Sequence, residues 1–219
     1  MADLVVFGTG DIASLAHGYF SKDSPHRVVA FTVDREFRQG PTFEQLPVVE
    51  FDTVAAHYPP DRFAMFIALG YTRMNTVRAQ KYQAAKAQGY ELVSYISSRC
   101  TLLTDNPIGD NCFILEDNTI QPFATIGSDV TLWSGNHIGH HSTIRDHCFV
   151  TSHVVVSGHV EVGSHCFLGV NATIRNGVTL GPRTLVGAAA AIMHDTEPDS
   201  VYVSAKARKS SHTSGDIKL

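Results

Sequence analysis

The sequence predicts a parallel β-helix that follows a small α/β domain, and three observations indicate this fold class. An aliphatic residue recurs at every sixth position from Leu102 to Ile192, with no residue inserted or deleted. A small or β-branched residue stands four positions after the aliphatic one, in a series that runs from Cys112 to Ala190. Upstream, over residues 1–98, apolar strands alternate with helix-forming segments, which is the pattern of a parallel α/β sheet.

The six-residue period excludes an α-helix, whose apolar face recurs every three or four residues. In a β-helix each hexapeptide forms one short strand and a turn, and the aliphatic residue points to the axis. With three hexapeptides in each triangular coil, about five coils are expected, and residues about 18 apart lie above one another. Glycine often follows the aliphatic residue, as at Gly109, Gly139 and Gly163. We expect a turn with positive φ at these glycines.

The first domain opens with a strand, a glycine turn and a helix. Residues 4–10 read LVVFGTG, residues 11–20 have helical spacing, and a second strand over 27–33 ends at Asp34. An acidic residue about two dozen positions after the glycines is typical of nucleotide-binding halves. Further strands are expected over 47–50, 62–69 and 91–96, and helices over 53–57 and 72–89.

The glycine turn allows two interpretations. Gly8 and Gly10 lack the third glycine of the dinucleotide fingerprint, because Ala13 stands in its place, so a redox dinucleotide is not expected. A nucleotide phosphate could lie on the helix N-terminus, with Asp34 binding the ribose or base. Alternatively, the glycines only make a tight turn that Asp34 caps.

Composition restricts the class of protein. The net charge of −4 and the isoelectric point near 6.3 provide no basic surface for nucleic acid, and no apolar run is long enough to span a membrane. The N-terminus lacks a charged leader, so a cytoplasmic protein is expected. Three of the four cysteines, Cys112, Cys148 and Cys166, fall in the small inward row. We expect buried, reduced thiols.

Histidines are concentrated in the repeat, where eight of the twelve lie between residues 137 and 194. Five of them are spaced by six: His141, His147, His153, His159 and His165. This column is either a metal ladder or a row of polar residues on the surface. Stations six apart lie on different sides of the prism, which favours the second interpretation and no bound metal.

His140 is the candidate catalytic base. A neutral imidazole can accept a proton from an attacking amine or hydroxyl near neutral pH, as acyl transfer requires. Gly158 lies one coil above His140 in the predicted stack, and its missing side chain would leave room over the imidazole for a thin substrate. This geometry favours His140 over the neighbouring histidines.

The repeat, the GTG turn and the segments GHHSTI, SGHVEVG and CFLGVNATIRNGVTLG together resemble bacterial sugar acyltransferases. This is the family of the sialic acid O-acetyltransferase NeuD and the nucleotide-linked amino-sugar N-acetyltransferase PglD, and the resemblance covers about residues 4–195. It implies a left-handed β-helix, a homotrimer with active sites between neighbouring prisms, and acetyl-coenzyme A as the acyl donor. It also implies a Rossmann-like acceptor domain over 1–98, a β-helix acyltransferase domain over 99–197 and a C-terminal tail over 198–219.

The resemblance also implies roles for individual residues. It assigns the general base to His140, the coenzyme A groove to Gly158 and Ala188, and the acceptor site to Gly8, Gly10 and Asp34.

Several positions depart from the family pattern. His141 stands where relatives carry a glutamate that orients the base, and Phe149 replaces a histidine that contacts the thioester. We therefore expect His141 at the catalytic site and Phe149 beside the cofactor. The carboxylate that orients His140 is expected to be Asp117, Asp146 or one from the adjacent subunit. Two more departures are Asp11 and Ile12 in place of a glycine–histidine pair, and an exit segment VYVSAKARK without the usual proline.

The expected function is acetyl-coenzyme A-dependent acetylation of a sugar by direct attack in a ternary complex, without a metal. A nucleotide-linked amino sugar of surface polysaccharide or glycan biosynthesis is the favoured acceptor. Sugar O-acetylation of the sialic acid type and a non-catalytic relative that binds sugar nucleotides are the alternatives. A zinc hydratase of the γ-carbonic anhydrase type resembles this chain less, because its ligands are spaced five apart and no histidine pair here has that spacing. The basic residues Lys206, Arg208 and Lys209 are either a solvated tail or lie near an anionic ligand.

Overall fold

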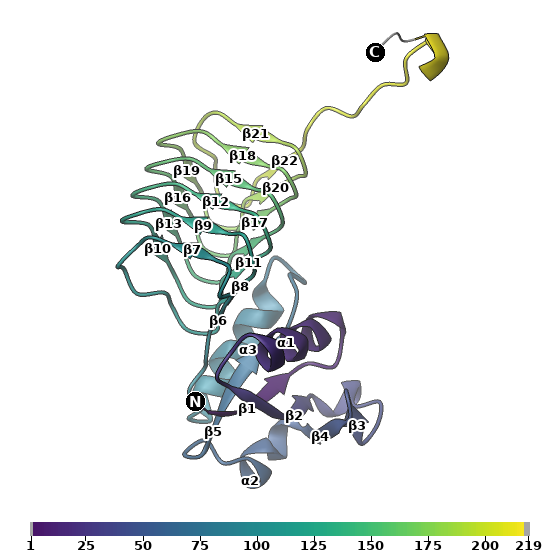
Figure 1. The fold of residues 1–219 in the computed structure, drawn as a ribbon, viewed down its shortest axis with the longest axis vertical. Helices are drawn as coiled ribbons and strands as arrows, with labels where there is room; N and C mark the ends of the chain where they lie inside the picture. Colours follow the sequence, from purple (N-terminus) through teal and green to yellow (C-terminus); the bar gives the residue numbers. More distant parts are fainter. Residues whose placement is uncertain (1, 217–219) are drawn as a thin grey trace.

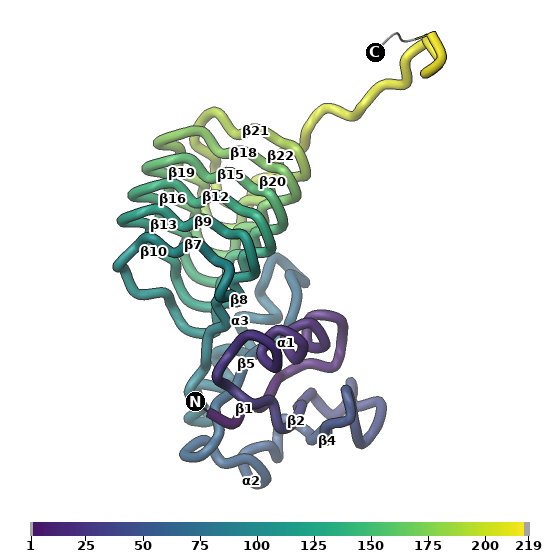
Figure 2. The backbone as a smooth tube through the Cα atoms, in the orientation of Figure 1, coloured from purple at the N-terminus to yellow at the C-terminus, as the bar shows by residue number. Residues whose placement is uncertain are grey.

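The computed structural model describes residues 2–216. An α/β domain lies at one end of a triangular prism of stacked coils, and residues 203–216 extend away from the other end (Figure 1). The backbone trace shows the coils stacked with almost no insertions (Figure 2). The predicted order, an α/β domain followed by a parallel β-helix, is confirmed. Within the described residues, no helix combines the length and the apolar composition that crossing a bilayer requires.

The α/β domain contains a five-stranded sheet with the strand order β3-β4-β2-β1-β5. All neighbours pair in parallel except β3, which forms a short antiparallel hairpin with β4 that the sequence analysis did not predict. The elements are β1 (Asp3–Phe7), α1 (Asp11–Lys22), β2 (Arg27–Val33), η1 (Arg35–Phe37), β3 (Thr42–Phe43), β4 (Leu46–Glu50), η2 (Phe51–Thr53), α2 (Val54–His57), β5 (Phe63–Ile67) and α3 (Thr76–Ala87).

The sheet is covered on both faces, because strand β1 is apolar at successive positions. Leu4 and Val6 pack in one core cluster with Phe20 of α1. Val5 and Phe7 point the other way and share a cluster with Tyr82 and Ala85 of α3. A continuous apolar strand buried on both faces is the usual consequence of parallel pairing between helices.

Three parallel sheets form the sides of the prism. The seven-stranded side contains β6 (Tyr95–Ile96), β8 (Phe113–Ile114), β11 (Thr131–Leu132), β14 (Phe149–Val150), β17 (Phe167–Leu168), β20 (Leu185–Val186) and β22 (Val201–Tyr202). The six-stranded side contains β7 (Thr101–Leu102), β9 (Thr119–Ile120), β12 (His137–Ile138), β15 (Val155–Val156), β18 (Thr173–Ile174) and β21 (Ala191–Ile192). The four-stranded side contains β10 (Thr125–Ile126), β13 (Thr143–Ile144), β16 (Glu161–Val162) and β19 (Thr179–Leu180), and a last 3₁₀ turn η3 spans Ser214–Asp216.

Both predicted inward rows are buried. Ile138, Ile144 and Val150 of the aliphatic row have no exposed surface, and neither do Cys148 and Val154 of the small row. Residues 18 apart pair directly, as Ile126 does with Ile144. The cysteines in this row are buried free thiols, as predicted.

The predicted position of the positive φ angles is wrong. Gly109, Gly139 and Gly163 do not have positive φ; the left-handed residues lie two positions further on, at stations that include Asn111 and His141. The glycines are required by close approach instead, because a Cβ on Gly139 would lie 2.5 Å from the backbone nitrogen of Gly158. At the left-handed stations Asn, Asp and His are the side chains best tolerated after glycine. The histidine column occupies this left-handed station, where turn geometry tolerates it.

The strand expected over residues 91–96 does not form as one element. Leu92 makes a single bridge with Met65 of the α/β sheet, and the chain then leaves that sheet. Ser94 bonds to the prism instead, since its hydroxyl donates to the Gly109 carbonyl and accepts from the Cys112 N–H, each at 2.8 Å. Strands β6 and β22 are therefore the first and last strands of the seven-stranded side. The first precedes and the second follows the range 99–197 that was predicted for the β-helix domain.

The α/β domain packs against the seven-stranded side of the prism. Helix α3 begins at Thr76, later than predicted, because the preceding loop turns through three left-handed residues, Arg73 to Asn75. The ring of Tyr71 in this loop lies 5.0 Å from Phe149 and 4.7 Å from Phe167, measured between ring centroids. On the α1 side, Tyr19 packs on Phe113 in the same manner.

A buried ion pair fastens α3 to the prism. Arg78 is 1% exposed, and its Nε lies 3.0 Å from Oδ1 of Asp129. Its Nη2 also donates to the carbonyl of His147 at 3.0 Å, and Asn111 donates to Asp129 Oδ1 at 2.7 Å. Every member of the network has hydrogen-bonding partners, which a buried charge requires.

Candidate active site

The corner between the six-stranded and four-stranded sides carries the candidate catalytic residues. We call it the far corner; it consists of residues 121–123, 139–141, 157–159 and 175–177. In a triangular prism this corner lies opposite the seven-stranded side. The α/β domain packs against that side, so the residues predicted to bind the acceptor, Gly8, Gly10 and Asp34, lie away from the far corner of the same chain.

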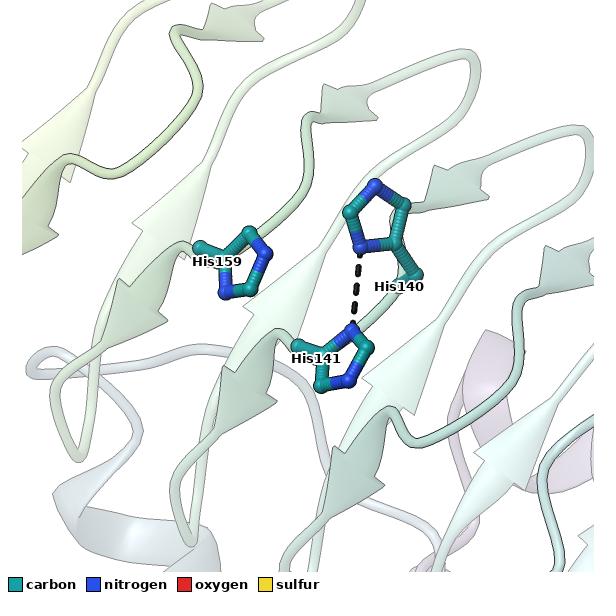
Figure 3. A group of neighbouring side chains, drawn as sticks. All are labelled: His140, His141 and His159. Atoms are coloured by element: carbon teal, nitrogen blue, oxygen red, sulfur yellow. Dashed lines mark hydrogen bonds between the residues drawn. The ribbon is translucent and has the colours of Figure 1, made fainter.

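Three exposed histidines meet at the far corner, as Figure 3 shows. The Nδ1 atoms of His140 and His141 are 3.1 Å apart. The rings of His141 and His159 are stacked, with centroids 4.8 Å apart and planes inclined by 12°. Phe123 continues this stack on the other face of His141, at 4.6 Å.

Gly158 lies one coil above His140, as predicted, but the prediction that it leaves room over the imidazole for a thin substrate is wrong. A Cβ on Gly158 would lie 2.7 Å from both Cε1 and Nε2 of His140, so the imidazole ring itself occupies the space left by the missing side chain. The His140 N–H donates to Oε1 of Gln121 at 2.9 Å, and the His140 carbonyl accepts from the N–H of His159 at 2.9 Å. The backbone that carries the candidate base is therefore held from the coils on both sides.

Neither predicted carboxylate of this chain orients His140. Asp117 accepts from Arg99 at 2.8 Å, and Oδ1 of Asp146 accepts from the backbone N–H of Ser128 at 2.8 Å. Among residues 2–216, no hydrogen bond joins either carboxylate to His140. Within one chain the group at Nδ1 of His140 is His141, which stands where the glutamate of the sequence resemblance was expected.

Phe149 and Ala188 lie away from the far corner. Phe149 belongs to the seven-stranded side and is 2% exposed, because Tyr71, Phe167 and the Arg78 guanidinium pack around it. Ala188 is exposed on the turn after β20, and its carbonyl accepts from the Ser204 hydroxyl at 2.8 Å. One chain alone does not bring either residue to His140, so their part in cofactor binding stays a prediction.

The glycine turn of the α/β domain has the conformation that the sequence predicted. Gly8 has φ +123°, and a Cβ there would lie 2.8 Å from the carbonyl oxygen of Ala68. Gly10 is the N-cap residue of α1, and a Cβ on it would meet open space. A cleft of about 170 Å³ beside this turn is lined by Thr9, Gln39, Gly40, Thr42, Phe43 and Val48.

Asp34 is placed near this turn by β2 but does not cap it. Its carboxylate accepts from the Lys81 ammonium at 2.6 Å, and the same ammonium lies over the rings of Phe7 and Phe51. Gly8 and Asp34 are close in the fold, because the Gly8 N–H donates to the carbonyl of Thr32 at 2.8 Å. The alternative in which Asp34 is the cap is therefore wrong.

A second cleft, of about 560 Å³, lies between α1 and the first coils. Tyr19 and Glu116 face each other in it, with the Tyr19 hydroxyl donating to Glu116 Oε2 at 2.9 Å. Burial, reinforced by the Glu116 carboxylate, raises the pKa of Tyr19 to about 12. Tyr19 therefore stays protonated near neutral pH, and the contact tethers α1 to the prism. No sequence pattern predicts this cleft, because its walls come from segments about 80 to 100 residues apart.

Comparisons with known proteins identify the fold. A family profile described as hexapeptide repeat of succinyl-transferase matches residues 159–192. No curated protein matches the sequence.

Solved structures match almost the whole chain. A mutant of perosamine N-acetyltransferase from Caulobacter crescentus, in complex with CoA and GDP-perosamine, has a TM-score of 0.81 and 22% identity over 92% of this chain and 93% of that chain. WeeI from Acinetobacter baumannii has a TM-score of 0.78 and 17% identity over 92% and 96% of the two chains. The acetyltransferase domain of PglB from Neisseria gonorrhoeae has a TM-score of 0.76 and 20% identity over 91% and 94%.

These matches define the class of fold: a left-handed β-helix of hexapeptide repeats with an N-terminal α/β domain, as predicted. The resemblance to sugar acyltransferases that the sequence indicated is confirmed in the fold of the chain. One of these solved structures is described as a perosamine N-acetyltransferase, and another as an acetyltransferase domain.

Proposed function

We propose that this protein is an acetyl-coenzyme A-dependent acetyltransferase whose acceptor is a nucleotide-linked amino sugar. The observation that carries the proposal is the far corner, where an exposed imidazole is oriented at one nitrogen and lies against a glycine. The fold supports the substrate class, because the perosamine N-acetyltransferase structure that shares it contains CoA and GDP-perosamine.

His140 is the general base in this proposal. If its proton lies on Nδ1, that N–H is donated to Nδ1 of His141, and Nε2 presents a free lone pair. His141 then does what an orienting carboxylate does elsewhere, without adding a negative charge. In this proposal His141, which was predicted to belong to the catalytic site, has the role of orienting the base.

The reaction needs no other titrating group. The acceptor amine bonds to the acetyl carbonyl carbon as His140 Nε2 takes its proton, and the carbon–sulfur bond then breaks. The proton passes from the imidazolium to the departing thiolate, so the products are an amide and coenzyme A, and the base is neutral again. Bringing both substrates into one cleft supplies much of the acceleration.

The acceptor turn and the base come from different copies of the chain in this proposal. Gly8, Gly10 and Asp34 lie in the domain that covers the seven-stranded side, whereas His140 lies at the opposite corner. Packing of three prisms around a common axis would place the far corner of one copy against its neighbour, since cyclic symmetry repeats the same contact. A homotrimer is therefore part of the proposed mechanism.

The nucleotide binds at the glycine turn in this proposal. The first backbone N–H groups of α1 point to the N-terminal end, where the helix dipole favours an anion. Asp11 follows Gly10 directly and places a carboxylate in the same turn. A phosphate bound there must lie on the Gly8–Gly10 side, next to the 170 Å³ cleft.

Thiol release from acetyl-coenzyme A tests this function. The purified full chain is offered nucleotide-linked amino sugars, the matching sugar nucleotides with a hydroxyl in place of the amine, and free sugars. We expect release with the amino sugars alone and a product one acetyl group heavier by mass spectrometry. Equal release with the hydroxyl compounds would make the enzyme an O-acetyltransferase, and no release with any acceptor would contradict the proposal.

A further inference from the structure

The three histidines of the far corner also have the composition of a metal site. His140, His141 and His159 each offer one ring nitrogen within 4.8 Å of the other two, and all three side chains are exposed. Figure 3 shows the rings side by side, with His141 and His159 on adjacent coils and His140 next to them. A free nitrogen lone pair on each of three imidazoles is a common donor set for zinc.

The spacing of two of these nitrogens already suits a tetrahedral ion. Zinc–nitrogen bonds of about 2.0–2.1 Å at tetrahedral angles place two ligand nitrogens roughly 3.3–3.4 Å apart. The Nδ1 atoms of His140 and His141 are 3.1 Å apart. The separation of these two nitrogens is therefore close to that of two ligands of one ion, and the rings must turn so that both lone pairs point to it.

The third ring can reach the same ion by rotating. The centroid of His159 lies 5.0 Å from that of His140 and 4.8 Å from that of His141. The next coil places Gly177 at the station above His159, and a Cβ on that glycine would meet nothing within 4 Å. No side chain at that station opposes rotation of the His159 ring.

The other histidines of the column do not form such a group. The rings of His147 and His165 also lie close, with centroids 4.8 Å apart and planes inclined by 37°, but Nδ1 of His147 is hydrogen-bonded to the buried carboxylate of Asp129 at 2.8 Å. His153 occupies the same left-handed station at another corner and lies against Gly135. Among the described histidine stations, only the far corner has a neighbouring histidine, His140, that supplies a third nitrogen.

We propose that His140, His141 and His159 bind one Zn²⁺ per chain, and that the bound ion inhibits the enzyme. Zinc requires a deprotonated ring nitrogen from each histidine. If the ion takes Nε2 of His140, the basic lone pair is occupied. If it takes Nδ1, the neutral ring must carry its proton on Nε2, and that nitrogen can no longer accept one. The inhibition rests on the proposed function, whereas the binding does not.

Zinc binding is measured on the full-length chain after treatment with EDTA, by competition with a chromophoric chelator. We expect one Zn²⁺ per chain and a loss of acetyl transfer in proportion to occupancy, reversed by EDTA. His159→Asn is the test variant, because asparagine also accepts a left-handed backbone. It should bind zinc more than about tenfold more weakly, since the site loses one of three protein ligands. Its acetyl transfer without metal is the reference for the effect of added zinc, and zinc should inhibit this variant only at correspondingly higher concentrations.

His153→Asn is the matched control, since it removes a histidine from the same station at a different corner. It should change neither zinc binding nor inhibition. Wild-type affinity in His159→Asn, or absence of stoichiometric binding to the wild type, would overturn the site. Stoichiometric binding without inhibition of an active enzyme would overturn the regulatory part. If no acceptor supports acetyl transfer, the binding assay still decides the site, while the proposed function fails separately.

Discussion

At the scale of the residue, left-handed turns account for both the histidine column and the candidate site. One residue in six must adopt positive φ, and His141, with φ 58°, and His159, with φ 56°, do so on adjacent coils. Stacking of the coils then places their rings face to face. The candidate site lies where a second histidine, His140, precedes this station and Gly158 leaves space for its ring.

The first prediction concerns the loss of the proposed general base. His140→Ala should lower kcat by roughly 10²–10⁴-fold, which is the usual contribution of a positioned general base. The melting temperature should not fall, because the side chain is exposed and its backbone contacts remain. Steady-state kinetics and a thermal melt on the same sample check both parts. Turnover close to that of the wild type would refute the assignment.

Gly158→Ala tests the close approach to the imidazole. The added Cβ would lie 2.7 Å from two ring atoms of His140, so the ring must move, whereas the backbone at Gly158 can accept alanine. We expect kcat to fall by up to about 100-fold, as misplacement of a catalytic group does. In the His140→Ala background the same change should cost nothing further. An additional loss in that background would show that Gly158 acts by another route.

At the scale of the element, helix α3 fixes the position of the α/β domain on the prism. Arg78 donates to the carbonyls of Gly70, Asp129 and His147 and pairs with the Asp129 carboxylate. These partners come from the α/β loop and from two successive coils. The helix therefore cannot slide along the prism without breaking a buried network.

Arg78→Met should destabilise the chain by about 3–5 kcal/mol, because it leaves the Asp129 carboxylate buried without its cation. Urea denaturation measures the change. Arg99→Met is the matched control, since the side chains of Arg99 and Asp117 are 68% and 56% exposed, and little change is expected. Equal effects of the two substitutions would contradict a special role for the buried pair.

The same interface predicts a dependence of stability on pH. Burial, aided by repulsion from His147, Arg78 and Arg183, lowers the pKa of His165 below the ordinary value of 6.5. The unfolded chain then binds more protons than the folded one as the pH falls through 6.5, so the free energy of unfolding should decrease.

Denaturation between about pH 7.5 and 5.5 measures this slope. His165→Asn keeps a left-handed residue and should flatten the slope. His153→Asn, at the exposed station of another corner, should leave the slope as it is. An unchanged slope in His165→Asn would exclude His165 as its source.

At the scale of the whole molecule, the prism was predictable because its constraint is local and periodic. Every sixth residue points to the axis and must be aliphatic, as Ile138 and Ile144 are. This spacing predicts the fold without any information on which residues are in contact. The pairing of His140 with Gly158 followed from the same register. This part of the site could be derived from the sequence because both residues belong to the repeat.

The remaining features depend on contacts that the period does not encode. Arg78 and Asp129 are separated by 51 residues, and Lys81 and Asp34 by 47, so no local pattern relates them. The contact of His141 and His159 with His140 depends on ring rotations, which spacing alone does not determine. The error over the glycines arose because glycine suits both a close approach between coils and a positive φ, and the sequence alone does not tell which of the two applies.

Complementation between two inactive variants tests whether the base and the acceptor turn come from adjacent copies of the chain. His140→Ala lacks the base, and Gly10→Glu places a carboxylate at the anion site, where the added side chain meets open space. Each variant alone should be inactive as a folded trimer. The two are co-expressed with different tags, and assemblies that carry both tags are purified.

If the base and the acceptor turn come from adjacent copies, the doubly tagged trimers should recover about a third of the wild-type activity, because in every mixed trimer one of the three seams combines an intact base with an intact turn. If one chain supplies both groups, no mixed assembly contains a complete site. Recovery of acetyl transfer in the doubly tagged trimers is the result we predict. Doubly tagged trimers as inactive as the two parent variants would contradict a site shared between adjacent copies.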